Sequence, residues 1–216
     1  VRAVGSGTDQ DEPLPERIES LIRSRLAALP PQALALVRVI SVAGEHAGEG
    51  LVLRAAAEWG DDVLARLRAT GIVAREGVRM SHPLWREYVA AAMTPEEVSQ
   101  THWLVAEHLQ ALAEVTGQAH HRAAAGSHLL AAYEALPRMD LAEPAVEGAL
   151  TAGEAAARSY AARSVIRILE PAHDIYLTLP SDRRLSLAGA MGKALLDLGE
   201  AWRLEGDETR AETWFQ

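Results

Sequence analysis

Histidine is the residue type in this chain whose clustering could hold a metal ion. Five of the eight histidines lie close together in the sequence: His102, His108, His120, His121 and His128. His121 and His128 are seven residues apart, which places them on one face of a helix. The sequence lacks an HExxH motif, and no carboxylate stands at ligand spacing from these histidines. We therefore expect no metal site and interpret the histidines as surface residues and contacts between helices.

No nucleophile or phosphate-binding loop is predicted. The chain contains no cysteine, which excludes thiolate zinc sites and cysteine nucleophiles together. It has no GxSxG motif, and Gly5-Ser6-Gly7 lies in a lead-in where nothing would hold a nucleophile rigid. The segment from Gly189 to Ala194 (GAMGKA) lacks the spacing and the hydroxyl of a phosphate loop. We expect a chain that is not an enzyme and binds no cofactor itself.

The elements of the first half follow the order of a winged helix. Residues 1–14 are rich in Gly, Ser, Asp and Pro and predict a flexible lead-in. Apolar residues at helical spacing then predict helices from Pro15, from Pro31, over 51–59, and from Asp61 to a stop at Gly71. Residues 72–75 and 78–81 predict two short strands around a tight turn at 76–77. Residues 15–93 are thus expected to form a winged-helix-like domain with one β-hairpin.

Nearly everything after the hairpin is predicted to be helical. The segment from Thr94 to Glu97 (TPEE) combines a capping Thr, a first-turn Pro and a capping-box Glu. Breaks at Gly117, Pro137, Pro180 and Gly206 separate further helices, and Pro171 is expected to kink one of them. Small residues from Gly153 and from Gly199 should permit close helix contacts. We predict an all-α chain in which residues 94–216 form tetratricopeptide-like antiparallel hairpins.

The charge of the chain argues against nucleic acid and membrane partners. A net charge of −9 repels phosphate backbones unless a local basic patch overrides it. The expected recognition helix and wing offer only Arg66, Arg68, Arg75 and Arg79, so direct DNA binding is disfavoured. No apolar run approaches the roughly 18 residues of a spanning helix. Because the lack of cysteine also fits a reducing compartment, we expect a cytoplasmic protein with no membrane contact.

Two tryptophans of the repeat-like region are candidates for partner binding. Trp202 and Trp214 lie where solenoids offer concave binding surfaces. The alternative is that they anchor helix against helix, since large aromatic side chains dominate burial energies. If the chain is truncated, Trp214 would instead have lost its covering helix.

Three segments carry a family resemblance: residues 16–30 (ERIESLIRSRLAALP), 79–87 (RMSHPLWRE) and 127–132 (SHLLAA). The first resembles the segment that follows the nucleotide-binding core in bacterial STAND-type ATPases. The second resembles the element that closes the winged-helix domain of these proteins, and the third resembles the element that comes after that domain. These ATPases include the large LuxR-type transcriptional regulators related to the maltose activator. The last hairpins are similar to the tetratricopeptide-like region of those proteins. The resemblance covers most of residues 15–216, and its His-Pro-Leu segment is the most specific part.

The resemblance implies that the chain is a middle piece of a longer regulator. In the family an ATPase core precedes this region, and ATP or ADP is expected only there; a helix-turn-helix often follows. The expected last helix has no cap or stop signal, so we expect truncation at the C-terminus. A histidine at the end of the family's winged helix can contact the bound diphosphate, and the matching residue is His82. An imidazole N–H at a helix start suits a phosphate oxygen, although His82 could simply cap the helix ahead of Pro83.

The implied function is that of a non-catalytic sensor arm. The winged helix would contact the ATPase core of the same polypeptide and help to hold it inactive. The helical array would receive a protein or small-molecule inducer that shifts the population toward activity. The residues independently support only a helical interaction module, so a plain tetratricopeptide-like scaffold without a nucleotide link remains an alternative, as does a DNA-binding winged-helix regulator. The family also places such arms beside cyclase or kinase domains, so the output need not be transcription.

Overall fold

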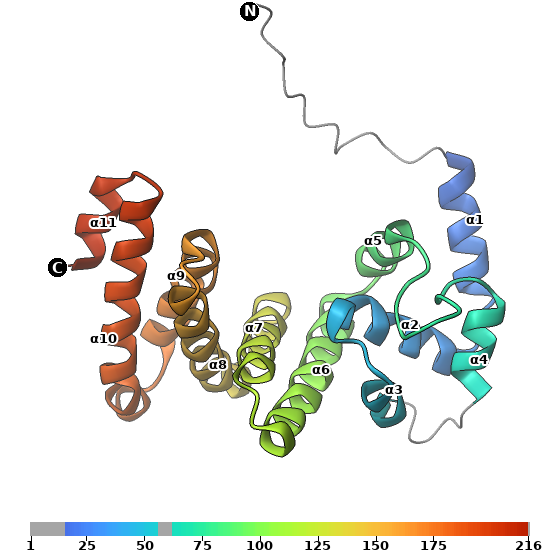
Figure 1. Ribbon diagram of the computed structural model, residues 1–216, viewed down its shortest axis with the longest axis horizontal. Helices are drawn as coiled ribbons and strands as arrows, with labels where there is room; N and C mark the ends of the chain where they lie inside the picture. The colour runs from blue at the N-terminus through green and yellow to red at the C-terminus, as the bar shows by residue number, and fades with distance from the viewer. Residues whose placement is uncertain (1–15, 56–61, 216) are drawn as a thin grey trace, which may run out of the picture.

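The computed structural model describes residues 16–55 and 62–215, and it confirms an all-α architecture for this part of the chain. Figure 1 shows an N-terminal lobe at one end, followed by helices that succeed one another in chain order to the C-terminal end. The described helices are α1 (Glu16–Ala27), α2 (Pro31–Ala43), the short 3-10 helix η1 (Gly44–His46), α3 (Glu49–Ala55), α4 (Asp62–Ala69), α5 (Pro83–Ala91), α6 (Pro95–Thr116), α7 (Ala119–Ala135), α8 (Met139–Arg158), α9 (Ala162–Thr178), α10 (Ser181–Leu204) and α11 (Glu208–Phe215).

Helix α2 is the centre of the N-terminal lobe. It is apolar along most of its length because it contacts α3, α4, α5 and α6. Pro31 occupies its first turn, as predicted. Its buried side chains form the N-terminal core with residues from α1, α4, α5 and the segment between α4 and α5; this core includes Leu36, Val37, Ile40, Leu67, Ile72 and Trp85. The predicted lead-in 1–14, the capping Asp61 and the end of the predicted helix 51–59 lie outside the described residues.

The predicted β-hairpin is not confirmed, although one bridge forms across the predicted turn. The described residues contain no strand here, only one isolated antiparallel bridge between Val73 and Met80. Hydrogen bonds from Ala74 N to Arg79 O and from Ser81 N to Ile72 O, both 2.9 Å, centre the pairing on residues 76–77, as predicted. The tip of the loop also bonds to another element, since Arg68 on α4 donates to the Gly77 carbonyl at 3.0 Å.

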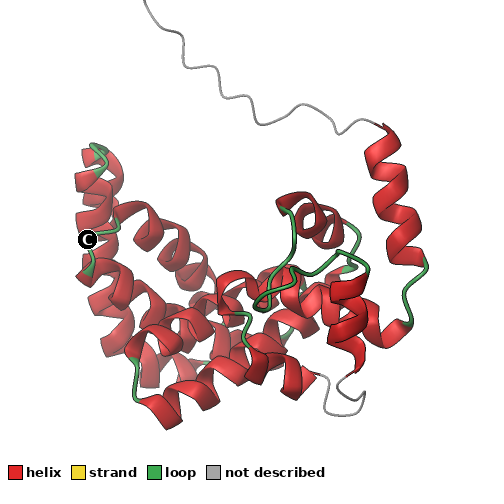
Figure 2. Cartoon of the chain, turned by 45° about the vertical axis from the view of Figure 1, so that its right-hand side comes forward, coloured by secondary structure: helices red, strands yellow, loops and turns green. Residues whose placement is uncertain are grey.

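Helix α6 begins and ends as predicted and opens the helical array, α6–α11. The Thr94 hydroxyl accepts from Glu97 N, and the Glu97 carboxylate accepts from Thr94 N, which completes the capping box. Gly117 ends the helix in the left-handed conformation at φ 69°. Each later helix packs on the one before it, and α8 also contacts α10. Figure 2 shows helices packed side by side along the molecule. Pro171 lies within α9.

Small residues bring the helices of the array close together. A Cβ on Gly126 of α7 would collide with the backbone of Gly148 on α8. Gly153 of α8 makes room for the side chain of a leucine on α9, and Gly199 of α10 makes room for the ring of Phe215 on α11. The close contacts predicted from Gly153 and Gly199 are therefore present. They surround the array core, which includes Val146, Ala149, Val165, Leu169 and Leu198.

Candidate functional site

A third apolar cluster joins the N-terminal lobe to the helical array. This junction core combines residues of α2, α3, α6 and α7: Val39, Ala43, Leu51, Val105, Leu109 and Ala125. Two ion pairs lie across the same boundary, Arg38–Glu97 at 2.7 Å and Arg54–Glu107 at 3.2 Å. Apolar burial and charge pairing therefore both join α6, whose main partner is α7 of the array, to the N-terminal lobe.

A polar cleft of about 580 Å³ opens at this junction. Its walls come from the end of α2, from η1, and from α5, α6, α7 and α9. The polar side chains that line it include His46, Arg86, His102, His128, Glu134 and Arg167. The volume is within the range of small-molecule binding sites, roughly 300–1,000 Å³. Residues from both lobes are therefore within reach of one ligand.

Two imidazoles in this cleft are hydrogen-bonded to each other. Nδ1 of His102 and Nδ1 of His128 lie 2.8 Å apart, so one ring donates and the other accepts. Burial lowers the pKa of His102 to about 4. Burial, and then the nearby His102, His46 and Arg86, lower the pKa of His128 to about 3. Both rings are accordingly neutral at pH 7, and the shared hydrogen bond is compatible with this because it needs one ring to accept. His46 packs edge-on against His128 with ring centroids 6.1 Å apart.

Two arginines enter the cleft from different lobes. The Arg86 guanidinium of α5 packs against Gly44, where a Cβ would lie 3.3 Å from its nitrogens. The backbone of α5 is held nearby, since the Ser41 hydroxyl donates to the Arg86 carbonyl at 3.1 Å. Arg167 of α9 lies near Glu134 of α7; burial raises the pKa of Glu134, and the charge of Arg167 offsets part of that rise. The cleft thus holds two exposed arginines, one of which, Arg86, packs against Gly44.

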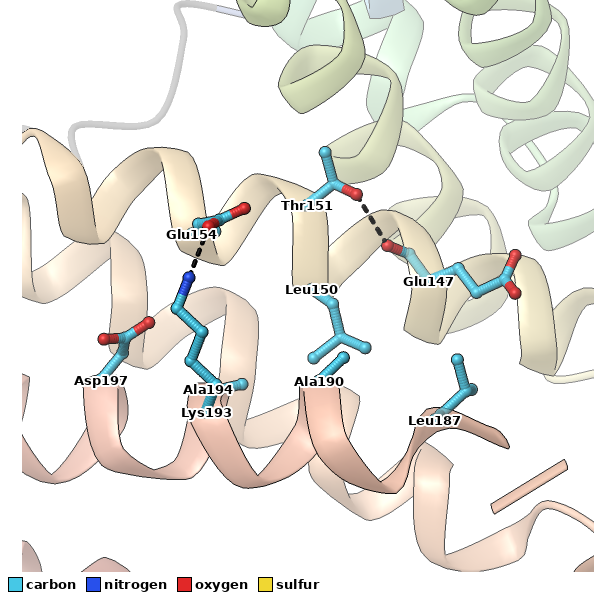
Figure 3. A pocket seen from close by; sticks show the side chains of 9 residues that line it. All are labelled: Glu147, Leu150, Thr151, Glu154, Leu187, Ala190, Lys193, Ala194 and Asp197. Carbon is cyan, nitrogen blue, oxygen red and sulfur yellow. Dashed lines mark hydrogen bonds and ion pairs between the residues drawn. The ribbon is translucent and has the colours of Figure 1, made fainter. Parts of the chain in front are cut away.

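A second groove, of about 380 Å³, lies between α8 and α10 (Figure 3). Lys193 of α10 reaches across it to the carboxylate of Glu154, which also pairs with Arg158. The hydrogen bond from Lys193, and then the charge of Arg158, lower the pKa of Glu154. Glu147 and Asp197 line the same groove. The ammonium group of Lys193 is already paired with Glu154, so this groove offers a ligand fewer unpaired cationic groups than the junction cleft.

His82 caps α5 and lies outside the junction cleft. Its Nδ1 accepts a hydrogen bond from Leu84 N at 3.2 Å, and the side chain is exposed. The capping role weighed from the sequence is therefore present. In the neutral ring this leaves the proton on Nε2. Arg86 follows one turn later in the same helix, so α5 connects His82 to the cleft.

Trp202 and Trp214 pack between helices of the array. Trp202 Nε1 donates to the Glu170 carboxylate of α9 at 2.9 Å, and Arg210 of α11 lies 4.4 Å from the centre of its ring. Trp214 meets the ring of His173 edge-to-face, with centroids 5.2 Å apart. Both tryptophans are partly buried against the array core, so a large part of each ring is used to join α9, α10 and α11.

Sequence reasoning missed the junction cleft. It grouped His121 with His128 by spacing, but the structure pairs His128 with His102, and His121 lies against Thr116. The signal was present in the clustering of histidines on α6 and α7. The arginines could not be added, because they lie on elements distant in sequence. Within residues 16–55 and 62–215, no group of three or more histidines and carboxylates is placed to hold a metal ion.

Comparison with models of protein families, with characterised proteins and with solved structures found no match for the chain. Among the helices that the structure describes, none combines the length and the apolar character needed to cross a membrane.

Proposed function

We propose that this chain is a non-catalytic regulatory arm of a STAND-type, LuxR-like cytoplasmic regulator. The N-terminal lobe is the winged-helix-like part and contacts an ATPase core of the same polypeptide. The helical array is the tetratricopeptide-like part and receives an inducer. This assignment is supported by the resemblance of the sequence and by the helix order α2, α3, α4, bridged segment, α5.

The observation that carries the proposal is the position of His82 on α5. Its ring caps the helix through Nδ1 and leaves Nε2 free for a ligand oxygen outside the described chain. The same helix delivers Arg86 to the junction cleft, where the array begins. A small movement of α5 would therefore displace both His82 and Arg86. Such a shared displacement is required to couple a bound nucleotide to a bound inducer.

The test uses the polypeptide that carries this chain together with its ATPase core. Release of a fluorescent ADP analogue is compared between the wild type and His82→Asn, because Asn keeps the helix cap but removes the imidazole. We expect release to accelerate by about tenfold, the effect of losing one hydrogen bond to a charged phosphate. His120→Asn, at another exposed histidine, is the matched control. Unchanged release in His82→Asn would favour the plain interaction scaffold instead.

A further inference from the structure

The junction cleft contains two arginines that have no carboxylate at ion-pair distance. Within the described part of the chain, neither the Arg86 nor the Arg167 guanidinium has an ion pair or a hydrogen bond, although the charge of Arg167 acts on the nearby Glu134. By contrast, Arg38 and Arg54 at the same junction are both paired with carboxylates of α6. Unpaired guanidinium groups that share a cleft favour an anionic ligand, since a charged acceptor gives the stronger hydrogen bonds.

Arg86 is placed for this task by the backbone beneath it. Gly44 has φ 57°, a conformation that favours glycine, and its missing side chain leaves room for the guanidinium at 3.3 Å. A guanidinium held by packing loses less conformational entropy when it binds a ligand. The contact with Gly44 therefore restricts an otherwise exposed side chain before any ligand arrives.

The other charged and titratable groups facing the histidine pair come from η1, α5, α7 and α9. Glu45 of η1 is 89% exposed and 4.0 Å from His46, so its carboxylate lies largely in water. Glu134 of α7 lies beside Arg167, and burial raises its pKa. The carboxylate of Glu45 thus lies on the solvent side, and that of Glu134 lies beside Arg167. The groups around Arg86 and the two imidazoles are therefore positively charged or neutral.

We infer that the junction cleft binds a phosphate group of a small molecule, with Arg86 from the N-terminal lobe and Arg167 from the helical array as its main partners. Donors that come from several elements suit a tetrahedral group, whose oxygens accept from different directions. A planar carboxylate is satisfied by one guanidinium fork. The hydrogen-bonded pair of His102 and His128 supplies a further N–H donor.

Such a ligand would bridge the two lobes beside α6. Its regulatory consequence rests on the proposed function: a bound phosphate would favour one angle between the lobes and so bias the ATPase core. The binding itself does not depend on that function, because all of the named groups belong to this chain.

The experiment titrates the purified chain with sodium phosphate at pH 7 and constant ionic strength, by calorimetry and by NMR of the histidine rings. We expect one saturable site and shifted ring resonances of His102 and His128. Arg86→Gln and Arg167→Gln should each weaken binding by about tenfold or more. Arg122→Gln, an exposed arginine of α7 outside the cleft, should change it less than about twofold. Circular dichroism checks that each variant is folded.

Three results would overturn the inference: no saturable binding of phosphate at millimolar concentration, equal binding of the dicarboxylate succinate, or unchanged affinity in both arginine variants. The test is separate from that of His82, because it needs no ATPase core. Loss of phosphate binding in these variants with unchanged ADP release in His82→Asn would support the site and reject the proposed nucleotide link.

Discussion

Replacing Leu109 by alanine should destabilise both lobes at once. Leu109 lies on α6 in the junction core and is only 1% exposed. Removing its three terminal carbons leaves a cavity that packed neighbours fill only in part, which costs about 3 kcal/mol. For a domain of this size that loss lowers the melting temperature by about 6–12 °C. Leu177→Ala, on α9 and 53% exposed, is the control and should change stability by less than about 0.5 kcal/mol.

Urea denaturation and hydrogen exchange followed by mass spectrometry provide the assay. Exchange in Leu109→Ala should rise in α2 and α3 as well as in α6 and α7, because all four contribute to the junction core. Leu198→Ala removes an equally buried leucine from the array core and should affect α8–α11 first. A loss below about 1 kcal/mol for Leu109→Ala, or faster exchange in one lobe alone, would refute the view that the junction core couples the lobes.

Three further predictions concern packing, capping and pH. Gly126→Ala should destabilise the fold by about 1–3 kcal/mol in thermal denaturation, because the added methyl group meets the backbone of α8. Gly192→Ala, which has open space around it, should stabilise the fold by about 0.5–1 kcal/mol, and equal effects of the two substitutions would contradict the close contact. Thr94→Ala removes the capping box of α6 and should cost about 1 kcal/mol in urea denaturation, and no loss would mean that the cap contributes nothing. Burial lowers the pKa of His102 to about 4 and of His128 to about 3, so below pH 6.5 the unfolded chain binds more protons than the folded chain, and stability should fall as the pH is lowered from 6.5 to 4. The double variant with Asn at both positions should show a weaker fall in its urea midpoints over this range, and a pH profile identical to that of the wild type would contradict the assignment.

Local signals predicted most of the helices correctly. The Thr94 capping box, the Pro31 first turn and the Gly117 stop each act within one turn of backbone, so the sequence alone defines them. The predicted hairpin is reduced to one bridge, between Val73 and Met80, on either side of the predicted turn at 76–77. The tip of this loop bonds instead to Arg68 of α4, a contact that local patterns do not encode.

The candidate site depended on contacts between distant segments, which local patterns do not encode. His102 and His128 belong to neighbouring helices, and their pairing follows from how α6 packs on α7. Arg86 and Arg167 reach the same cleft only because α5 and α9 approach α7 from either lobe. Helical spacing placed His121 and His128 on one face of the same helix, because it relates residues within a helix and carries no information about the neighbouring helix.

The central claim is that the chain acts as one rigid lever because its two lobes are held together at the α6 junction. A distance measurement between the lobes tests this claim most directly. The natural absence of cysteine allows two spin labels to be introduced cleanly, at Glu76→Cys in the exposed loop before α5 and at Leu196→Cys on α10. Pulsed electron resonance should give one narrow distance distribution, which Leu109→Ala broadens. A broad distribution with the junction core intact would contradict the account.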